Sequence, residues 1–331
     1  MVLFIGFFVC TGIIFFAGTR LSLYSDVIAE KTGLGRTWIG LVLVASVTSL
    51  PEMVNSIGSV TYAGVPDIAA GDLIGSCVFN LLIIAFLDLL YRKSPISSIA
   101  RTGHIISGSF GILQLSVIIL GIFLGRRVPV FGGVGINSII SILIYLLAMR
   151  LIYQYEKKSI NNETKKHEIE LYPDIAFKKA VWLFILNALL VIGAAIFLPK
   201  IGEGIAELTG LGQTFVANIL IALSTSLPEA VVCFGALKCK AVDLAMGNLM
   251  GSTIFNIAIL GFVDILYTNG PILCFVSQNH IISAISAVVI TSIVTISLTY
   301  RAEKKYLPLS LDAILIVGVY LLNVTLLYLL R

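Results

Sequence analysis

The chain has 331 residues, of which 58% are hydrophobic and only 12% are charged, and its mean hydropathy is +1.03. Soluble domains carry about 25% charged residues, so this sequence lacks the polar surface that a soluble fold of this length requires. Nucleic-acid binding is also excluded, because 22 basic against 18 acidic residues leave a net charge of only +4 and no basic cluster within a polar domain. The composition therefore predicts an integral membrane protein surrounded by the lipid bilayer.

About ten apolar stretches are long enough to cross the hydrocarbon core, which takes roughly 20 residues in a helix. The expected spans are 2–27, 37–62, 68–90, 102–125, 131–150, 179–200, 213–237, 243–267, 279–300 and 309–330. The first lacks the basic end of a signal peptide, so we expect it to be retained. The polar segment 153–178 is the predicted linker between two five-helix halves, 1–152 and 179–331.

The basic residues predict the orientation of these spans. If the N-terminus lies outside, 17 of the 22 basic residues fall in loops on the cytoplasmic side and four fall outside. The excess of Lys and Arg in cytoplasmic loops favours this arrangement. We therefore expect both termini outside the cell membrane and the central linker in the cytoplasm.

The five cysteines lie in or at the ends of apolar stretches, and none forms a CxxC pair. They are typical of small buried side chains and not of a disulfide framework or a zinc site. We expect no resident cofactor, and the sequence is compatible with a monomeric chain.

An internal repeat relates the two halves. Residues 32–52 (TGLGRTWIGLVLVASVTSLPE) match 209–229 (TGLGQTFVANILIALSTSLPE) at 12 of 21 positions without a gap. The match continues in GDLIGSCVFN (71–80) and GNLMGSTIFN (247–256). Shared membrane composition would match Leu, Ile and Val, whereas these matches are Thr, Ser, Pro, Glu, Asn and Gly.

Five spans per repeat is an odd number, so the second half enters the membrane in the opposite sense. The expected fold is an all-α membrane protein with about ten transmembrane helices in two inverted-topology repeats. In transporters with this architecture the site forms near the midplane between the repeats. The repeat thus favours transport by alternating access.

Glu52 and Glu229 lie in the middle of the second and seventh predicted spans. A carboxylate at that depth costs a few kcal/mol unless something compensates it, and is a functional candidate by default. No basic residue lies near the middle of any predicted span. A bound cation is therefore the favoured partner, and protonated glutamates in interhelical hydrogen bonds are the alternative.

A proline immediately precedes each of these glutamates and lacks the N–H that a helix needs. We expect the helices to break around 45–48 and 222–225, which frees backbone carbonyls at membrane depth. Hydroxyl groups lie three and four residues before each glutamate, on the same helical face. They belong to Thr48, Ser49, Thr225 and Ser226. Carboxylates, hydroxyls and carbonyls form an all-oxygen shell that hard cations such as Ca²⁺ and Na⁺ prefer.

The third and eighth spans supply polar side chains at a spacing of four residues. Ser76 and Asn80 share one face, as do Ser252 and Asn256. The repeat places both pairs opposite the glutamate helices, which favours ligation over simple hydrogen bonding between helices. Glycines that recur every four residues in these spans, at 71, 75, 247 and 251, are typical of close helix packing.

Further polar residues are expected to act mainly at helix ends. Asp88 and Asp264 lie close to the far ends of their spans, and anchoring is favoured over ligation. His104 and His280 begin the next spans, where polar contacts at the helix ends are favoured over a proton-linked role. Asp72, early in the third span and matched by Asn248, stays open between both kinds of role.

These motifs resemble the two alpha-repeats of the cation/calcium exchanger superfamily, and most closely its sodium/calcium exchanger branch. VTSLPE (47–52) with GSCVFN (75–80), and STSLPE (224–229) with GSTIFN (251–256), carry the resemblance. It implies an electrogenic antiporter that exchanges Ca²⁺ for Na⁺ at midmembrane. It also implies that Glu52 and Glu229 ligate Ca²⁺ and that Thr and Ser before each glutamate contribute oxygens. Na⁺ sites would include Ser76, Ser252 and the carbonyls of Ala45 and Ala222.

The chain departs from the family pattern before each Thr-Ser pair, where Val47 and Ser224 replace the usual Gly. The Glu-containing repeats typical of the proton-coupled branch are absent, which favours Na⁺ over H⁺ as the coupling ion, with Ca²⁺/H⁺ exchange as the alternative. An intramembrane enzyme is disfavoured because HExxH and GxSxG motifs are absent. A cation channel fits the inverted repeat less well than coupled exchange.

Overall fold

The computed structural model describes residues 2–163, 171–197, 200–201, 225–302, 305 and 308–330. Eight described helices are long and apolar enough to cross a bilayer. They are α1 (Val2–Thr32), α5 (Pro66–Leu90), α7 (Gly103–Leu124), α8 (Ile136–Glu163), α9 (Phe177–Ala195), α14 (Val242–Leu266), α15 (His280–Tyr300) and α16 (Leu311–Leu329). Each forms because a helix satisfies every backbone N–H and C=O in lipid. The prediction of an all-α membrane protein is confirmed.

A ninth apolar segment consists of short helical pieces in series. These are α2 (Arg36–Trp38), the π-helix η1 (Ile39–Val44), α3 (Ala45–Thr48) and α4 (Leu50–Thr61). The pieces before and after Ser49 are bent by 42°. Of the predicted span 213–237, the structure describes the second part, which contains α13 (Leu227–Lys238). The expected break at 222–225 lies largely outside the described residues.

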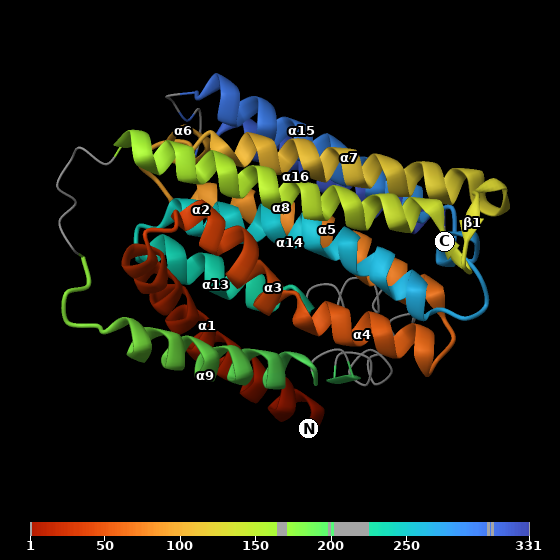
Figure 1. The fold of residues 1–331 in the computed structure, drawn as a ribbon, viewed down its shortest axis with the longest axis horizontal. Coiled ribbons are helices and arrows are strands. Elements are labelled where there is room, and N and C mark those ends of the chain that lie inside the picture. Colours follow the sequence, from red (N-terminus) through yellow and green to blue (C-terminus); the bar gives the residue numbers. More distant parts are fainter. Residues whose placement is uncertain are drawn as a thin grey trace.

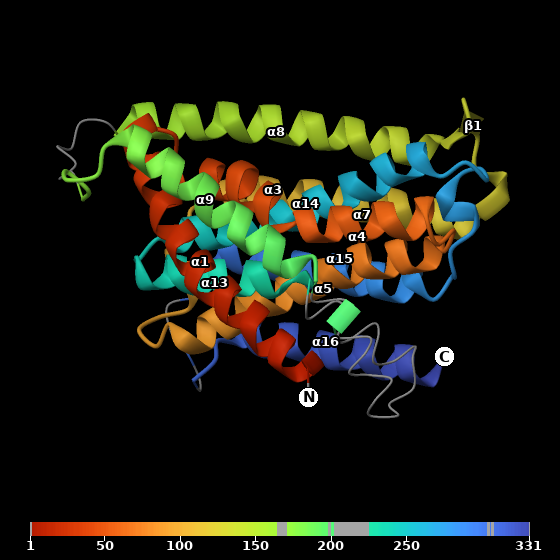
Figure 2. The ribbon, with the colours of Figure 1, turned by 90° about the horizontal axis from the view of Figure 1, so that it is seen from below.

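The helices are arranged around two central ones. In Figure 1, α5 and α14 run through the middle of the molecule, with α7, α8, α15 and α16 on one side. Helices α1 and α9 lie side by side on the opposite side, and α13 lies between α1 and α14 (Figures 1 and 2). Most side chains of α5 and α14 are buried, whereas large apolar side chains such as Phe8 and Trp182 are exposed on the outer helices. The surface is therefore suited to lipid.

The fifth predicted span starts later and ends later than expected. Residues 130–135 form a small hairpin, β1 (Val130–Phe131) paired with β2 (Val134–Gly135), and not the start of a helix. Gly132 and Gly133 at its tip have positive φ angles of 60° and 87°, as a tight hairpin turn requires. Helix α8 then continues to Glu163, well into the range predicted for the linker.

Short segments complete the described chain. They are α6 (Ile96–Ile99) and the 3₁₀ turns η2 (Gly125–Arg127) and η4 (Ile272–Cys274). Two of them follow aspartates at the ends of the central helices. Asp88 accepts a hydrogen bond from the backbone N–H of Ile96, and Asp264 accepts one from that of Ile272. Both aspartates thus hold the segment that follows their helix.

Candidate cation site

The two predicted glutamates lie in the first turns of α4 and α13, and both are fully buried. Each helix follows a residue with nearly the same backbone angles, φ −89° and ψ 8° at Ser49 and φ −86° and ψ 4° at Ser226. A helix N-terminus carries a partial positive charge that favours a carboxylate. The N-termini of α4 and α13 thus present equivalent carboxylates from the two repeats.

The first break lies one residue beyond the predicted range of 45–48. Helix α3 continues through Thr48 because the N–H of Ser49 still donates to the carbonyl of Ala45, at 3.0 Å. Pro51 interrupts the pattern only afterwards, since it has no N–H to donate. Val47, which replaces the usual Gly, is therefore accommodated as an ordinary helical residue. Ser224 lies outside the described residues.

Two hydroxyl groups connect the repeats in the same way. The Thr48 hydroxyl donates to Oδ1 of Asn248 at 3.1 Å, and the Thr225 hydroxyl donates to Oδ1 of Asp72, also at 3.1 Å. These are equivalent positions in the repeat, and each bond joins the residue four positions before one glutamate to the central helix of the other repeat. The sequence match alone shows that the positions are equivalent, but not which copies come into contact.

The serine hydroxyls make different hydrogen bonds around the two glutamates. Ser49 and Ser252 donate hydrogen bonds to Oε1 of Glu229, at 3.1 and 3.4 Å. Ser226, the counterpart of Ser49, donates instead to the hydroxyl of Ser76 at 3.1 Å. Glu229 is therefore held by hydroxyls from both repeats.

Several buried polar atoms at this point have no hydrogen-bond partner of regular geometry within the described part of the chain. They are both carboxylate oxygens of Glu52, Oε2 of Glu229, and the amide groups of Asn80 and Asn256. A buried polar group without a partner costs about 1–3 kcal/mol, and a charged one costs more. Since all of these residues come from the two matched motifs, the shared explanation is a ligand that they bind together.

The chemistry of the donor set fits a hard cation. The predicted carboxylates, hydroxyls and amide groups that the structure describes are fully buried, and hydrogen bonds between the repeats join several of the hydroxyls and the Glu229 carboxylate. Among the described residues no three acidic, His or Cys side chains converge on one point. A cation bound here would therefore take most of its ligands from neutral oxygens, as Ca²⁺ and Na⁺ do and soft metals do not.

Of the two backbone carbonyls proposed as ligands, the structure describes that of Ala45. The carbonyl of Ala45 accepts a hydrogen bond from the Ser49 N–H, and the Thr48 hydroxyl oxygen lies 3.3 Å from it. Because the single hydrogen of that hydroxyl is directed to Asn248, the Ala45 carbonyl keeps one acceptor position. Ala222 lies outside the described residues.

Two further residues, Asn55 and Cys233, contact polar residues at this site and were not predicted to do so. Asn55, one helical turn after Glu52, donates to Asp72 at 2.7 Å. The Nδ2 group of Asn248 lies 3.3 Å from the Sγ atom of Cys233. The spacing of Asn55 from Glu52 was a usable signal, because residues three apart share a helical face, but the thiol contact had none.

The predicted polar contacts of the histidines are also present, and they follow the repeat. His104 lies 3.2 Å from Asp243, and His280 lies 3.0 Å from Asp67. Each pair joins the first turns of two helices from different repeats. This confirms helix-end contacts for both histidines and places neither in the cation site.

Comparison with known families agrees with this geometry. Residues 2–154 and 179–329 match the family described as sodium/calcium exchanger protein. The chain belongs to this family. It is thereby a member of the cation/calcium exchanger superfamily, and its two matched segments cover nearly all of both halves.

Exchanger relatives include archaeal and bacterial proteins. The sodium/calcium exchanger MaX1 of Methanosarcina acetivorans is 28% identical over 278 residues, covering 73% of this chain and 77% of the relative. The inner membrane protein YrbG of Escherichia coli is 24% identical over 262 residues, or 78% of each chain. The putative antiporter CaxA of Alkalimonas amylolytica is 28% identical and covers 72% of this chain and 73% of its own length.

Solved exchanger structures share the fold. The sodium-calcium exchanger NCX_Mj soaked with Na⁺ and Sr²⁺ superimposes with a TM-score of 0.72 at 20% identity, covering 98% of this chain and 99% of that chain. The same exchanger soaked with Na⁺ and Ca²⁺ gives a TM-score of 0.73 at 19% identity, covering 98% of each chain. The chain is therefore a multi-pass membrane protein with the exchanger fold.

Proposed function

We propose that this protein is a Na⁺/Ca²⁺ antiporter that works by alternating access, with both ions bound at the two helix breaks. The observation that carries the proposal is the pair of fully buried glutamates, Glu52 and Glu229, of whose four carboxylate oxygens three have no hydrogen-bond partner within the described residues. Buried hydroxyl and amide groups of the same two motifs accompany them. Two carboxylates balance the charge of one Ca²⁺. Membership of an exchanger family supports transport of this ion.

In this proposal the two glutamates ligate Ca²⁺, and the other oxygens complete the shells of Ca²⁺ and Na⁺. These oxygens belong to Thr48, Ser49, Thr225, Ser226, Ser76, Ser252, Asn80 and Asn256, with the carbonyls of Ala45 and Ala222. Ca²⁺ takes six to eight oxygen ligands in flexible geometry, so a shell with few charges and many neutral oxygens suits it. The relatives named as sodium/calcium exchangers support Na⁺ as the coupling ion.

The proposed topology follows the basic residues. Both termini lie outside, the linker 153–178 lies in the cytoplasm, and the halves 1–152 and 179–331 cross the membrane in opposite senses. Ions then reach the site from one side at a time, because each half supplies one broken helix to the same buried cluster.

Exchange of Ca²⁺ for protons is the second candidate. It is favoured by the same two carboxylates, since a buried carboxyl group without a cationic partner can also hold a proton. The two candidates differ in the gradient that drives Ca²⁺ movement.

The test is a flux experiment with purified protein in liposomes, in which Na⁺ and pH gradients are imposed independently. We expect Ca²⁺ uptake to follow the Na⁺ gradient, and to fall at least about 100-fold in Glu52→Gln and Glu229→Gln, because each variant removes half of the negative charge that balances Ca²⁺. Glu156→Gln is the matched control, since Glu156 is equally buried but contacts Arg101 at the end of α8. Uptake that follows only the pH gradient would assign Ca²⁺/H⁺ exchange instead.

A further inference from the structure

Seven acidic side chains are buried among the described residues, and they fall into two groups. Asp26, Asp88 and Glu156 each contact an Arg or Lys, and Asp264 accepts backbone N–H groups from two separate loops. The second group is Glu52, Glu229 and Asp72, for which no ion pair with a cationic side chain is found within the described residues. Asp72 therefore shares the electrostatic situation of the two proposed Ca²⁺ ligands.

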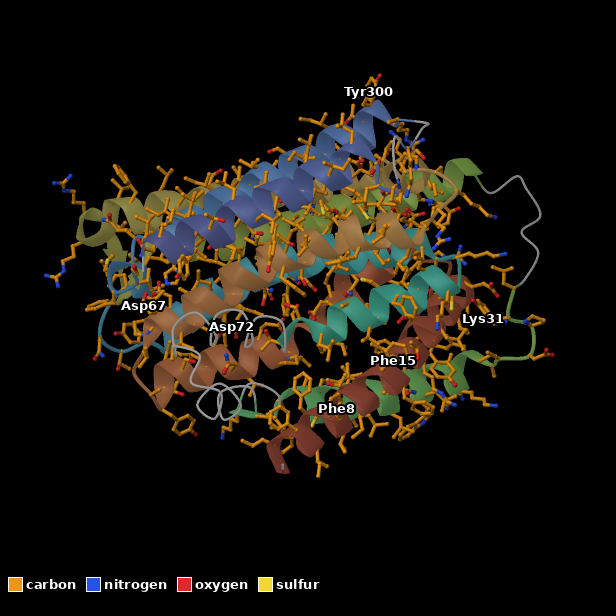
Figure 3. All side chains as sticks on the ribbon, turned by 180° about the vertical axis from the view of Figure 1, so that it is seen from behind. Phe8, Phe15, Lys31, Asp67, Asp72 and Tyr300 are labelled. Carbon is orange, nitrogen blue, oxygen red and sulfur yellow. The ribbon has the colours of Figure 1, made fainter. Side chains whose placement is uncertain are left out.

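Asp72 also shares their location. It lies on α5, four residues before Ser76 and eight before Asn80, and therefore on the same face of the helix. Only 5% of its surface is exposed. Figure 3 shows Asp72 inside the bundle, whereas Asp67 lies at its end. The Thr225 hydroxyl that bonds to Asp72 belongs to the residue just before Ser226, four residues before Glu229. Asp72 is thus a third buried carboxylate beside the N-terminus of α13.

Both hydrogen-bond partners of Asp72 within the described part of the chain are neutral. Its Oδ1 atom accepts from the Thr225 hydroxyl at 3.1 Å and its Oδ2 atom accepts from the Asn55 amide at 2.7 Å. A carboxylate offers about four acceptor positions, so each oxygen has one beyond the bond described. The side chain is positioned by its two partners without being neutralised by them.

Comparison of the repeats separates geometry from charge. Asn248 occupies the equivalent place and accepts the Thr48 hydroxyl at the same distance of 3.1 Å. An amide therefore suffices for the hydrogen bond from the threonine, and the carboxylate in the first repeat adds a negative charge and a second acceptor oxygen, which the Asn55 amide uses. That charge is costly in a buried place, so it needs a compensating role.

We propose that Asp72 supplies a third negative charge that binds one additional coupled Na⁺ beside the Ca²⁺ site. This rests on the proposed Na⁺/Ca²⁺ exchange and deepens it. Since the three acids do not converge on one point, Asp72 acts on its own cation, next to Thr225, and not as a third carboxylate on Ca²⁺. With Asn at this position, the two sides of the site would carry equal charge and one Na⁺ fewer would move per Ca²⁺.

The test measures the coupling ratio in liposomes, with the potential clamped at zero by K⁺ and valinomycin and with equal pH on both sides. Under a tenfold Na⁺ gradient, the Ca²⁺ ratio at which net flux stops should be about tenfold smaller in Asp72→Asn than in the wild type, because each coupled ion contributes one factor of its gradient. The hydrogen bond from Thr225 is retained, and Asn55 can turn its amide oxygen toward the new amide. Folding should therefore be preserved.

The swap variant Asp72→Asn with Asn248→Asp is the matched control, since it restores three carboxylates on the mirrored side. We expect it to recover the wild-type ratio. If Asp72→Asn transports too slowly for this assay, the apparent Ca²⁺ affinity can be measured in detergent at several Na⁺ concentrations. The slope of its logarithm against the logarithm of Na⁺ concentration gives the number of competing Na⁺ ions, which should be smaller by about one in the variant.

An unchanged ratio or slope in Asp72→Asn overturns the proposal, and so does a change that appears only under a pH gradient. If both single and swap variants fail to fold, Asp72 is structural and the proposal is also wrong. A failure of the proposed function would be recognised separately, because the wild-type protein would then show no Na⁺-driven Ca²⁺ flux. In that case the inference on Asp72 would also be wrong.

Discussion

The close crossing of η1 and α14 leads to a prediction that can be worked out from distances. A Cβ atom added at Gly251 would lie 2.4 Å from the carbonyl oxygen of Leu41, 2.7 Å from the Cα of Leu41 and 2.9 Å from the Cβ of Ala45. Ordinary van der Waals contact begins at 3.4 Å. Because the contacting atoms include backbone, no change of rotamer relieves the clash, and the two segments must separate by about 1 Å.

Such a separation reaches the cation site directly. Ala45 begins α3, and the next turn carries Thr48, whose hydroxyl bonds to Asn248 on α14 at 3.1 Å. An increase of about 1 Å takes this bond beyond hydrogen-bonding distance. Overpacking costs about 1–3 kcal/mol, and loss of the hydrogen bond adds about 0.5–1.5 kcal/mol. We therefore expect Gly251→Ala to be destabilised by about 2–4 kcal/mol and to lose Ca²⁺ transport.

The assay is thermal unfolding of the purified protein in detergent, followed by Ca²⁺ flux in liposomes. Gly193→Ala on α9 is the control, because a Cβ atom there meets nothing within 4 Å. Replacing a helical Gly by Ala favours the helix by about 0.5–1 kcal/mol, so the control should be unchanged or slightly more stable. Equal unfolding temperatures and fluxes for the two variants would refute the close crossing of η1 and α14.

Two further predictions concern groups outside the cation site. Asp264→Ala removes the acceptor for the buried N–H groups of Gly135 and Ile272; it should cost about 2–5 kcal/mol by thermal unfolding, whereas Asp174→Ala, in an exposed loop, should cost nothing measurable. Burial, and then the hydrogen bond to Asp26, raise the pKa of Tyr172 above its usual value. The unfolded chain therefore loses this proton first, and the stabilisation is complete below about pH 10 and declines above it. Between about pH 9 and 11 the wild-type unfolding temperature should fall more steeply than that of Tyr172→Phe, and parallel curves would contradict this.

The sequence indicates which side chains belong to the candidate site more readily than which of them make contact. The repeat identifies equivalent positions, and the depth of Glu52 and Glu229 in apolar spans marks them as special. The sequence contains no information on which residue of one repeat contacts which residue of the other, so the bond from Thr48 to Asn248 could only be seen in the structure. Such pairings depend on how the two halves pack, and not on local sequence.

The local errors have equally physical causes. Residues 130–135 are apolar enough to suggest a helix, but two consecutive glycines favour a tight hairpin turn. The break of the second span lies at Ser49, beyond the predicted 45–48, because the backbone hydrogen bond to Ala45 is retained until the proline intervenes. The π-helix at Ile39–Val44 has no distinct sequence pattern, since it depends on the close approach of Gly40 to the backbone of α14.

The unequal surroundings of the two glutamates allow a final prediction about variants that the flux test already requires. Glu229 accepts two serine hydroxyls, and Glu52 accepts none of regular geometry among the described residues. Neutralising Glu229 weakens two charge-assisted hydrogen bonds at about 0.5–1.5 kcal/mol each, whereas neutralising Glu52 removes an uncompensated charge. Without Ca²⁺ or Na⁺, Glu52→Gln should therefore be more stable than Glu229→Gln by about 1–3 kcal/mol in thermal unfolding.

Addition of Ca²⁺ should make the wild type more stable than both glutamate variants. A ligand that binds only the folded protein raises its stability, so Ca²⁺ should stabilise the wild type strongly and both variants little. Ser49→Ala provides the control, because it removes one hydroxyl from Glu229 and should narrow the difference between the two glutamate variants. Equal stability of Glu52→Gln and Glu229→Gln without ions would mean that the two carboxylates are held alike, and that the asymmetric serine contacts do not persist in solution.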